Sequence, residues 1–142
     1  MDNDLIISAD AVGLFCRLHM KTKRNIPIRP SEMGVLIFTH KHNIPVTPLM
    51  ISNFFKIAKP SATSMINALI KQEYLHKEHS TTDGRSYIVS ATDKGRELVV
   101  STFNEYFKTM ELLKNRMGLI EFSAFIELIQ KANDILSEEK QQ

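Results

Sequence analysis

Residues 83–95 read Asp-Gly-Arg-Ser-Tyr-Ile-Val-Ser-Ala-Thr-Asp-Lys-Gly. The stretch joins a polar turn, a short run of aromatic and β-branched residues, and a threonine that is placed to cap a following helix. A second alternating run at 74–79 lies on the other side of the turn, so the pattern predicts a β-hairpin with Arg85 at its tip. Asp83 and Gly84 are residue types that favour tight turns, and Asp83 is placed either to hold Arg85 or to initiate the turn.

Two helical patterns that begin with proline lead into this hairpin. Thr47 and Pro48 form the start signal of the first, with threonine as the N-cap and proline at the first helical position. We expect that short helix to turn Ile51, Phe54 and Phe55 inward. The short spacing between the two patterns predicts a helix-turn-helix.

The second of these helices, opened by Pro60 and running to about Gln72, has two contrasting faces. One face is apolar, and the opposite face carries short polar side chains beside a base. Short hydroxyl and amide groups reach base edges without clashing, and Asn67 can pair bidentately with adenine. Without a hairpin beside it, the same face would be interpreted as ordinary solvated surface. The predicted DNA-binding residues of this helix are Lys59, Ser61, Thr63, Ser64, Asn67 and Lys71.

The rest of the chain predicts further helices on both sides of this segment. Apolar residues recur at helical spacing from Leu5 to about Lys23, and another helix begins at Pro30. Thr92 caps a long helix, and a last helix follows Gly118. The residues expected to face inward in the helices that start at Pro30 and after Thr92 are Met33, Leu36, Ile37, His40, Val99 or Val100, Phe103, Phe107, Met110 and Leu113. The predicted fold class is therefore mainly α with a small β-hairpin.

The composition is that of a globular protein of one domain. The chain has 142 residues, of which 43% are hydrophobic and 24% charged, with no apolar run long enough for a membrane span and no secretory leader pattern. Its single cysteine, Cys16, excludes an internal disulfide and fits a cytoplasmic location. Metal-ligand spacings, a nucleophile elbow, a phosphate-cradling glycine loop and converging carboxylates are all absent from the sequence. We therefore expect no metal, no cofactor, no membrane association and no enzymatic activity.

Positive charge is concentrated around the predicted helix-turn-helix. Residues 17–29 contain five Lys or Arg and no acid, and residues 41–97 contain eight against five acids, although the net charge of the whole chain is only +2. From Glu111 onward the sign reverses. Neutralisation of DNA phosphates requires such clustering, whereas ordinary solvated surface is the alternative interpretation. Double-stranded DNA is the partner that this distribution favours.

The order of elements and the hairpin motif together resemble the MarR family of bacterial transcriptional regulators. The family's wing signature is Asp, any residue and Arg, followed by a strand, a Thr and a Gly three positions later. It stands here as Asp83, Arg85, Thr92 and Gly95. The segment 51–63 is similar to the family's helix-turn-helix, and the resemblance extends over the whole length of the chain.

The resemblance implies one domain over residues 1–142. Residues 30–96 would form the winged helix-turn-helix, with the wing at 74–91, and residues 1–29 and 97–142 would supply dimerisation helices. It further implies a homodimer, usually a repressor, whose two recognition helices enter successive major grooves of a pseudo-palindromic operator. The wing arginine would enter the minor groove. The apolar stretches near both ends agree with a dimer, because a small monomer rarely leaves such faces exposed.

The chain departs from the family pattern at several positions. Many members carry Arg where this chain has Ser64 and Ala68, and they carry Gly where it has Glu73 and Lys56. Lys77 replaces the usual Arg at the start of the wing. A non-glycine residue has no low-cost access to positive φ. The departures leave the fold assignment intact, but operator and ligand cannot be carried over.

Three further interpretations stay open. Many family members release DNA when a small ligand binds, and Arg17, His19 and Tyr106 could supply polar contacts in such a cleft; ordinary core and dimer interface explain the surrounding residues equally well. Cys16 has Arg17 and His19 beside it, which would favour oxidation of the thiol, whereas its place on an apolar stripe favours a packing role. The last alternative is a winged-helix module that binds protein, or binds DNA without sequence selectivity.

Overall fold

The structure, a computed structural model, describes residues 2–21, 26–42, 44–79 and 87–140. The chain divides into two compact units, which we call the central unit (Ile26–Phe103) and the terminal unit (Met1–Asn25 with Asn104–Gln142). Within the described residues, no helix is long and apolar enough to cross a membrane.

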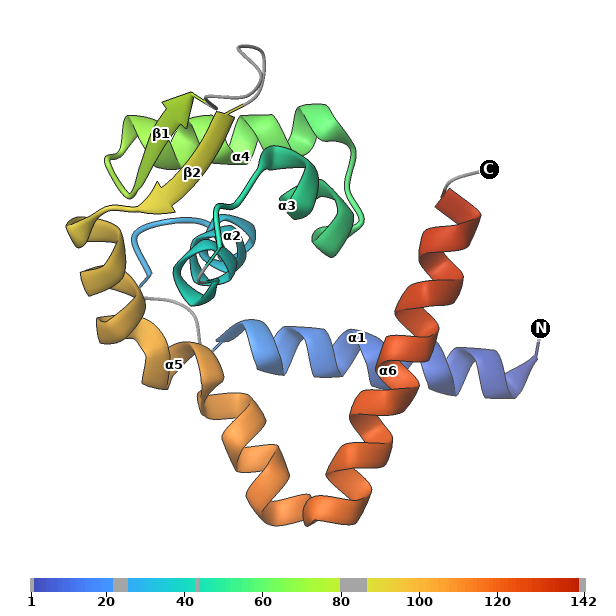
Figure 1. Cartoon of the computed structure of the whole chain (residues 1–142). Coiled ribbons are helices and arrows are strands. Elements are labelled where there is room, and N and C mark those ends of the chain that lie inside the picture. Colours follow the sequence, from blue (N-terminus) through green and yellow to red (C-terminus); the bar gives the residue numbers. More distant parts are fainter. Residues whose placement is uncertain (1, 22–25, 43, 80–86, 141–142) are drawn as a thin grey trace. The chain divides into compact units, whose positions relative to one another are not determined.

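The described residues of the central unit form three complete helices, a two-stranded hairpin and the first part of a long helix (Figure 1). In chain order the elements are α2 (Pro30–Lys41), α3 (Pro48–Phe55), α4 (Lys59–Lys71), β1 (Leu75–His79), β2 (Tyr87–Ala91) and α5 (Asp93–Met117). β1 and β2 are antiparallel, with Leu75 opposite Ala91. Val46 forms an isolated bridge with Val89, which ties the segment before α3 to the hairpin. The predicted fold class, mainly α with a small hairpin, is confirmed.

Local capping signals start two helices where the sequence predicts them. Thr47 is the N-cap of α3, and its hydroxyl oxygen accepts a hydrogen bond from the N–H of Met50 at 3.2 Å, with Pro48 at the first helical position. Thr92 caps α5 in the same way and accepts from the N–H of Gly95 at 3.0 Å. These oxygens satisfy amides that have no partner inside the helix. The helix starts were therefore predictable from local sequence.

The core of the central unit forms where α2 and α4 pack together and against the hairpin. Burying each large side chain there contributes about 1.5–3 kcal/mol relative to leaving it exposed. The largest fully buried side chains are Met33, Leu36, Ile51, Ile66, Leu69, Leu75, Val35 and Val46. The predicted stripe of α2 is wrong in part, because Ile37 and His40 are only half-buried while Val35, Phe38 and Thr39 are buried. A helix that is contacted by several elements buries more than one face.

Two aromatic residues that were expected to face inward are exposed instead. Phe54 is 58% exposed and Phe103 is 52% exposed. Phe54 lies in the last turn of the eight-residue α3, where its ring contacts that of Phe38 at 4.7 Å between centroids but leaves much of its surface uncovered. Phe103 is the last residue of the central unit. In α5 the sequence left either Val99 or Val100 as the inward residue, and Val99 is the buried one, with 3% of its surface exposed.

The terminal unit contains α1 (Asn3–Lys21), the later part of α5 and α6 (Leu119–Lys140). α1 and α6 cross (Figure 1), and the ring of Phe15 meets that of Phe125 edge-to-face at 5.6 Å between centroids. Gly118 separates α5 from α6 with a φ of +88°, a conformation that glycine adopts at low cost. The exposed large apolar side chains of this unit are Leu5, Ile6, Ile7, Val12, Leu14, Leu18, Leu112, Leu119, Ile120, Leu128, Ile135 and Leu136.

Candidate nucleic-acid interface

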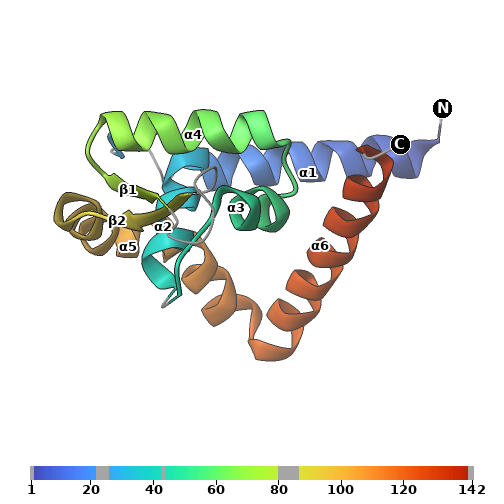
Figure 2. The same ribbon diagram turned by 45° about the horizontal axis from the view of Figure 1, so that its top comes forward.

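The helix α4 presents the predicted reading face outward. Figure 2 shows α4 along one edge of the central unit, with α2, α3 and the hairpin on one side of it. On that inner side Ala62, Ile66 and Leu69 are fully buried. The predicted DNA-binding residues occupy the rest of the helix: Lys59, Ser61, Ser64, Asn67 and Lys71 are exposed, and Thr63 on the flank is half-buried. The structure thus places all six on α4 and leaves five of them exposed, and their contact with DNA stays a prediction.

The start of α4 is suited to a phosphate group. The first amides of a helix lack partners inside it and carry the positive end of the helix dipole. The first turn of α4, all of it described, contains no acidic residue, and Ala58 at the N-cap position provides no side-chain cap. Lys59 begins the helix. An anion can therefore approach these amides without competition from a carboxylate.

The turn between α3 and α4 is held by a serine that the sequence patterns did not single out. Ser52 is buried, its hydroxyl donates to the carbonyl of Ile57 at 2.7 Å, and its carbonyl accepts from the N–H of Ile57 at 3.1 Å. Lys56 lies in the left-handed region with φ of 55°, and its N–H also donates to the Ser52 carbonyl. A serine inside a short apolar helix gives no distinctive sequence signal, because it more often faces solvent.

The end of α4 is closed by a Schellman arrangement without a glycine. The N–H of Glu73 donates to the carbonyl of Ile70, and the N–H of Tyr74 donates to that of Leu69, both at 2.9 Å. Glu73 has a φ of 68°, where a non-glycine residue costs about 1–2 kcal/mol. Both positions where the MarR pattern has glycine, Lys56 and Glu73, therefore keep the left-handed backbone with a different residue.

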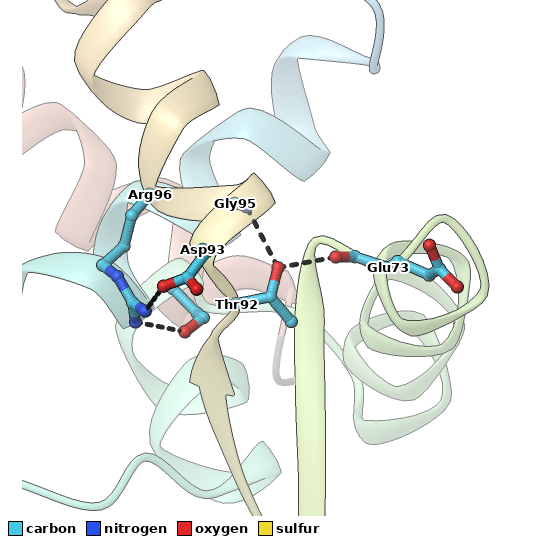
Figure 3. A network of polar contacts seen from close by, with 6 residues as sticks. Glu73, Thr92, Asp93, Gly95 and Arg96 are labelled. Atoms are coloured by element: carbon cyan, nitrogen blue, oxygen red, sulfur yellow. Dashed lines mark hydrogen bonds and ion pairs between the residues drawn. The ribbon is translucent and has the colours of Figure 1, made fainter.

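One polar network joins the end of α4 to the start of α5 at the base of the hairpin (Figure 3). The hydroxyl of Thr92 donates to the carbonyl of Glu73 at 2.6 Å and accepts from the N–H of Gly95 at 3.0 Å. The N–H of Thr92 donates to the carbonyl of Tyr74 at 3.1 Å. Thr92 and Gly95, which both belong to the wing signature, thus take part in the hydrogen bonds that join the end of α4 to the start of α5.

Gly95 is required by a close backbone approach. A Cβ atom at this position would lie 2.2 Å from the carbonyl oxygen of Tyr74, a distance that real Cβ atoms do not adopt. The presence of glycine three positions after Thr92 is therefore explained by this close approach of the backbone, which the sequence motif alone does not reveal.

Arg96, the next residue, forms an ion pair with Asp93 in the first turn of α5.

The described part of the wing carries a lysine held against the hairpin. The Nζ of Lys77 lies 4.3 Å from the centroid of the Tyr87 ring, a cation–π contact between the two strands. Lys77 therefore keeps a positive charge beside the stem of the wing. The predicted tip residues Asp83, Gly84 and Arg85 lie outside the described residues. Their role stays a prediction.

The predicted ligand and redox residues lie in the terminal unit. Arg17 is exposed, and His19 is half-buried with its ring stacked on that of Phe15 at 5.9 Å between centroids. The side chain of Tyr106 lies outside the described ones, so the predicted ligand contacts stay untested. Cys16 is exposed on α1 in the single chain, and both its packing role and its redox role stay predictions. Among the described residues, no group of three or more His, Cys, Asp or Glu is arranged to hold a metal ion.

Sequence comparison assigns the chain to a family. Residues 18–101, more than half of the 142 residues, match the model of the family described as transcriptional regulator SarA/Rot. The chain belongs to the SarA/Rot family of transcriptional regulators. The matched segment of this SarA/Rot member includes the whole helix-turn-helix and hairpin. No curated protein sequence matches the chain significantly.

Solved structures show that this SarA/Rot member has the predicted MarR-type fold. FabT from Streptococcus pneumoniae, in complex with DNA, has a TM-score of 0.76 at 18% identity, over 96% of this chain and 99% of that one. A MarR protein from Peptoclostridium difficile has a TM-score of 0.74 at 20% identity, over 98% and 91%. S. aureus MepR in a DNA-binding conformation has a TM-score of 0.73 at 13% identity, over 96% and 99%. The predicted winged helix-turn-helix is confirmed, and the matching family model is one of transcriptional regulators.

Proposed function

We propose that this SarA/Rot family member is a homodimeric repressor that reads a pseudo-palindromic DNA operator with α4 and the wing. The observation that carries the proposal is the outward face of α4. It presents short hydroxyl and amide side chains with a lysine near each end, and α4 contains no acidic residue. Such a face can approach both the base edges and the flanking phosphates of a major groove.

The dimensions of α4 support this assignment. Lys59 and Lys71 are twelve positions apart, which corresponds to about 18 Å along a helix. The major groove is about 12 Å wide, so the two ammonium groups can reach phosphates on opposite sides of the groove. Ser61, Ser64 and Asn67 then lie between them, where base edges are accessible. The lysines position the helix, and the short side chains select the sequence.

The wing completes the proposed contact. Arg85 at the tip would enter the adjacent minor groove, where a narrow A·T-rich segment deepens the negative potential. We expect Arg85→Ala to weaken operator binding by about 1–3 kcal/mol while the dimer keeps its melting temperature. Fluorescence anisotropy with labelled operator measures the first quantity, and thermal unfolding measures the second. Unchanged operator affinity would remove the wing tip from the mechanism.

Dimerisation is proposed from the terminal unit. Its α1 and α6 leave eleven of their described large apolar side chains exposed, and exposed apolar surface of that extent marks an interaction site. A second copy would cover these faces and would present two α4 helices to one duplex. FabT was solved in complex with DNA, which supports DNA as the partner for this fold.

Release by a small ligand is the least constrained part of the proposal. Arg17, His19 and Tyr106 are the candidate polar contacts for an anionic or phenolic compound. We expect such a compound to dissociate the operator complex of the native protein but not that of Arg17→Ala. Retention of the native complex across a panel of these compounds would remove ligand release from the proposal.

Selection of random duplex DNA at physiological salt tests the central claim. An enriched inverted repeat, with half-sites about one helical turn apart, is the result expected of a sequence-reading dimer. An enriched single half-site would contradict the dimer. Recovery of bulk DNA alone would overturn sequence reading and favour an architectural module.

A further inference from the structure

The base of the wing hairpin is closed by one hydroxyl group. The Thr92 hydroxyl donates to the carbonyl of Glu73 and accepts from the N–H of Gly95 (Figure 3), so both hydrogen-bonding roles of this side chain are in use. Glu73 follows the end of α4, whereas Gly95 lies in the first turn of α5. The N-cap hydroxyl of α5 therefore also forms a hydrogen bond to Glu73, just past the end of α4.

These contacts set the direction in which the hairpin leaves α4. Only residues 72–74 connect α4 to β1, and the reversal takes place at Glu73, which is left-handed. The carbonyls of Glu73 and Tyr74 both accept hydrogen bonds from Thr92, through its hydroxyl and its N–H. The strand pairing then continues with Leu75 opposite Ala91. Thr92, which directly follows β2, thus fixes the link between α4 and the wing.

A second side chain of α5 contacts the same link from outside. The Nζ of Lys94 donates to the carbonyl of Gln72 at 2.8 Å and lies 4.5 Å from the centroid of the Tyr74 ring. A cation at this place is favourable, because the C-terminal end of α4 carries the negative end of its dipole. All three residues between α4 and β1 are therefore held by α5 or by its N-cap.

We propose that Thr92 is a positioning residue for DNA discrimination, because its hydroxyl holds α4 and the wing at the relative angle at which both meet one operator. The inference rests on the proposed function of α4 and the wing as the two reading elements. Operator binding requires both elements in register with fixed base positions. Binding to bulk DNA depends on phosphate contacts that tolerate a change in this angle.

The test compares Thr92→Val with Thr92→Ser. Valine keeps the shape and removes both hydroxyl bonds, whereas serine retains a hydroxyl that can form them. The readouts are affinity for the selected operator, affinity for random duplex, the salt dependence of each and the melting temperature. We expect Thr92→Val to lower the ratio of operator to random affinity about tenfold, because α4 and the wing would no longer meet fixed base positions together, with an unchanged salt slope. Thr92→Ser should restore the ratio.

Thr47→Val is the matched control. Thr47 caps α3 with the same hydroxyl chemistry, and the bond to the Met50 N–H lies within one element. Its loss should lower the melting temperature as Thr92→Val does but leave the affinity ratio unchanged. An equal loss of ratio in both variants, or an unchanged ratio in Thr92→Val, would show that the Thr92 bonds are only structural and would overturn the inference.

A second variant covers a failure of Thr92→Val to fold, and the native protein's own sequence preference separates failure of the inference from failure of the proposed function. If Thr92→Val does not fold, Lys94→Met probes the same link from the exposed side, and the expected result is a ratio lowered about threefold. An unchanged ratio, or a salt slope reduced by about 0.9, would overturn the inference, because such a slope change indicates a lost phosphate contact. If the native protein prefers no sequence, the proposed function fails together with the inference. If it prefers one and Thr92→Val retains that preference, only the inference fails.

Discussion

Two non-glycine residues in the left-handed conformation bracket α4, the proposed recognition helix. Lys56 precedes α4 and Glu73 follows it, with φ of 55° and 68°. Both conformations persist because hydrogen bonds hold them, through Ser52 at one end and Thr92 at the other. Strain of this kind is retained where the surrounding structure over-determines the backbone. These two positions therefore hold the left-handed backbone although neither is glycine.

We expect Glu73→Gly to stabilise the protein. Glycine adopts positive φ without the Cβ penalty, and it is the preferred residue after a helix C-cap. Part of this gain is offset by the greater freedom of glycine in the unfolded chain, so the expected increase in unfolding free energy is about 0.5–1 kcal/mol. Thermal and denaturant unfolding measure it. Glu73→Ala removes the carboxylate but keeps the strain, so a similar gain in Glu73→Ala would contradict this reason.

Gly95→Ala should be strongly destabilising. The added methyl group would meet the Tyr74 carbonyl oxygen at 2.2 Å, and the backbone of α5 or of the hairpin must move to relieve the clash. The expected cost is about 2–3 kcal/mol. Gly13→Ala in α1 is the control, because a Cβ there has no neighbour within 4 Å and alanine favours a helix by about 0.5–1 kcal/mol. Equal effects of the two substitutions on Tm would contradict the steric argument.

At the scale of the element, we expect different residues of α4 to position the helix on the phosphates and to select the bases. Lys71→Ala should weaken binding to all sequences and lower the salt slope by about 0.9, as expected for one lost phosphate contact. Asn67→Ala should instead relax base preference at one position of the half-site, at a cost of about 1–3 kcal/mol on the operator. Both residues lie on the exposed face of α4, so each serves as the control for the other. An equal loss on all sequences for Asn67→Ala would demote Asn67 to backbone positioning.

Helix starts and burial differ in how far local sequence determines them. The starts of α3 and α5 follow from Thr47 and Thr92, because an N-cap acts within one turn. Burial depends on which elements arrive from elsewhere in the chain. Phe54 has the spacing of an inward residue but lies beyond the core at the end of a short helix, and its ring is largely exposed. Periodicity identifies a helix better than it identifies the covered face.

At the scale of the whole molecule, the exposed apolar faces of the terminal unit predict self-association. Leu128 on α6 is 66% exposed in the single chain. We expect Leu128→Glu to shift the protein from dimer to monomer, because a charge buried in an apolar interface is strongly unfavourable. Light scattering at several concentrations measures the molecular mass. Val100→Glu, at a similarly exposed apolar position of the central unit, should leave the dimer intact; dissociation by both would point to a general loss of folding.

The sequence by itself determined the order of helices, the position of the hairpin, the outward polar face of α4 and the resemblance to winged helix-turn-helix regulators. Each of these depends on signals within one or two turns of chain, namely caps, prolines and periodicity. Only the tertiary structure decided that the hydroxyl of Thr92 holds the carbonyl of Glu73, 19 positions away. Contacts between distant residues depend on how the elements pack, because the side chain that fills a hydrogen bond or covers a face is supplied by another part of the chain. Local pattern therefore located α4, and packing determined how its C-terminal end is held.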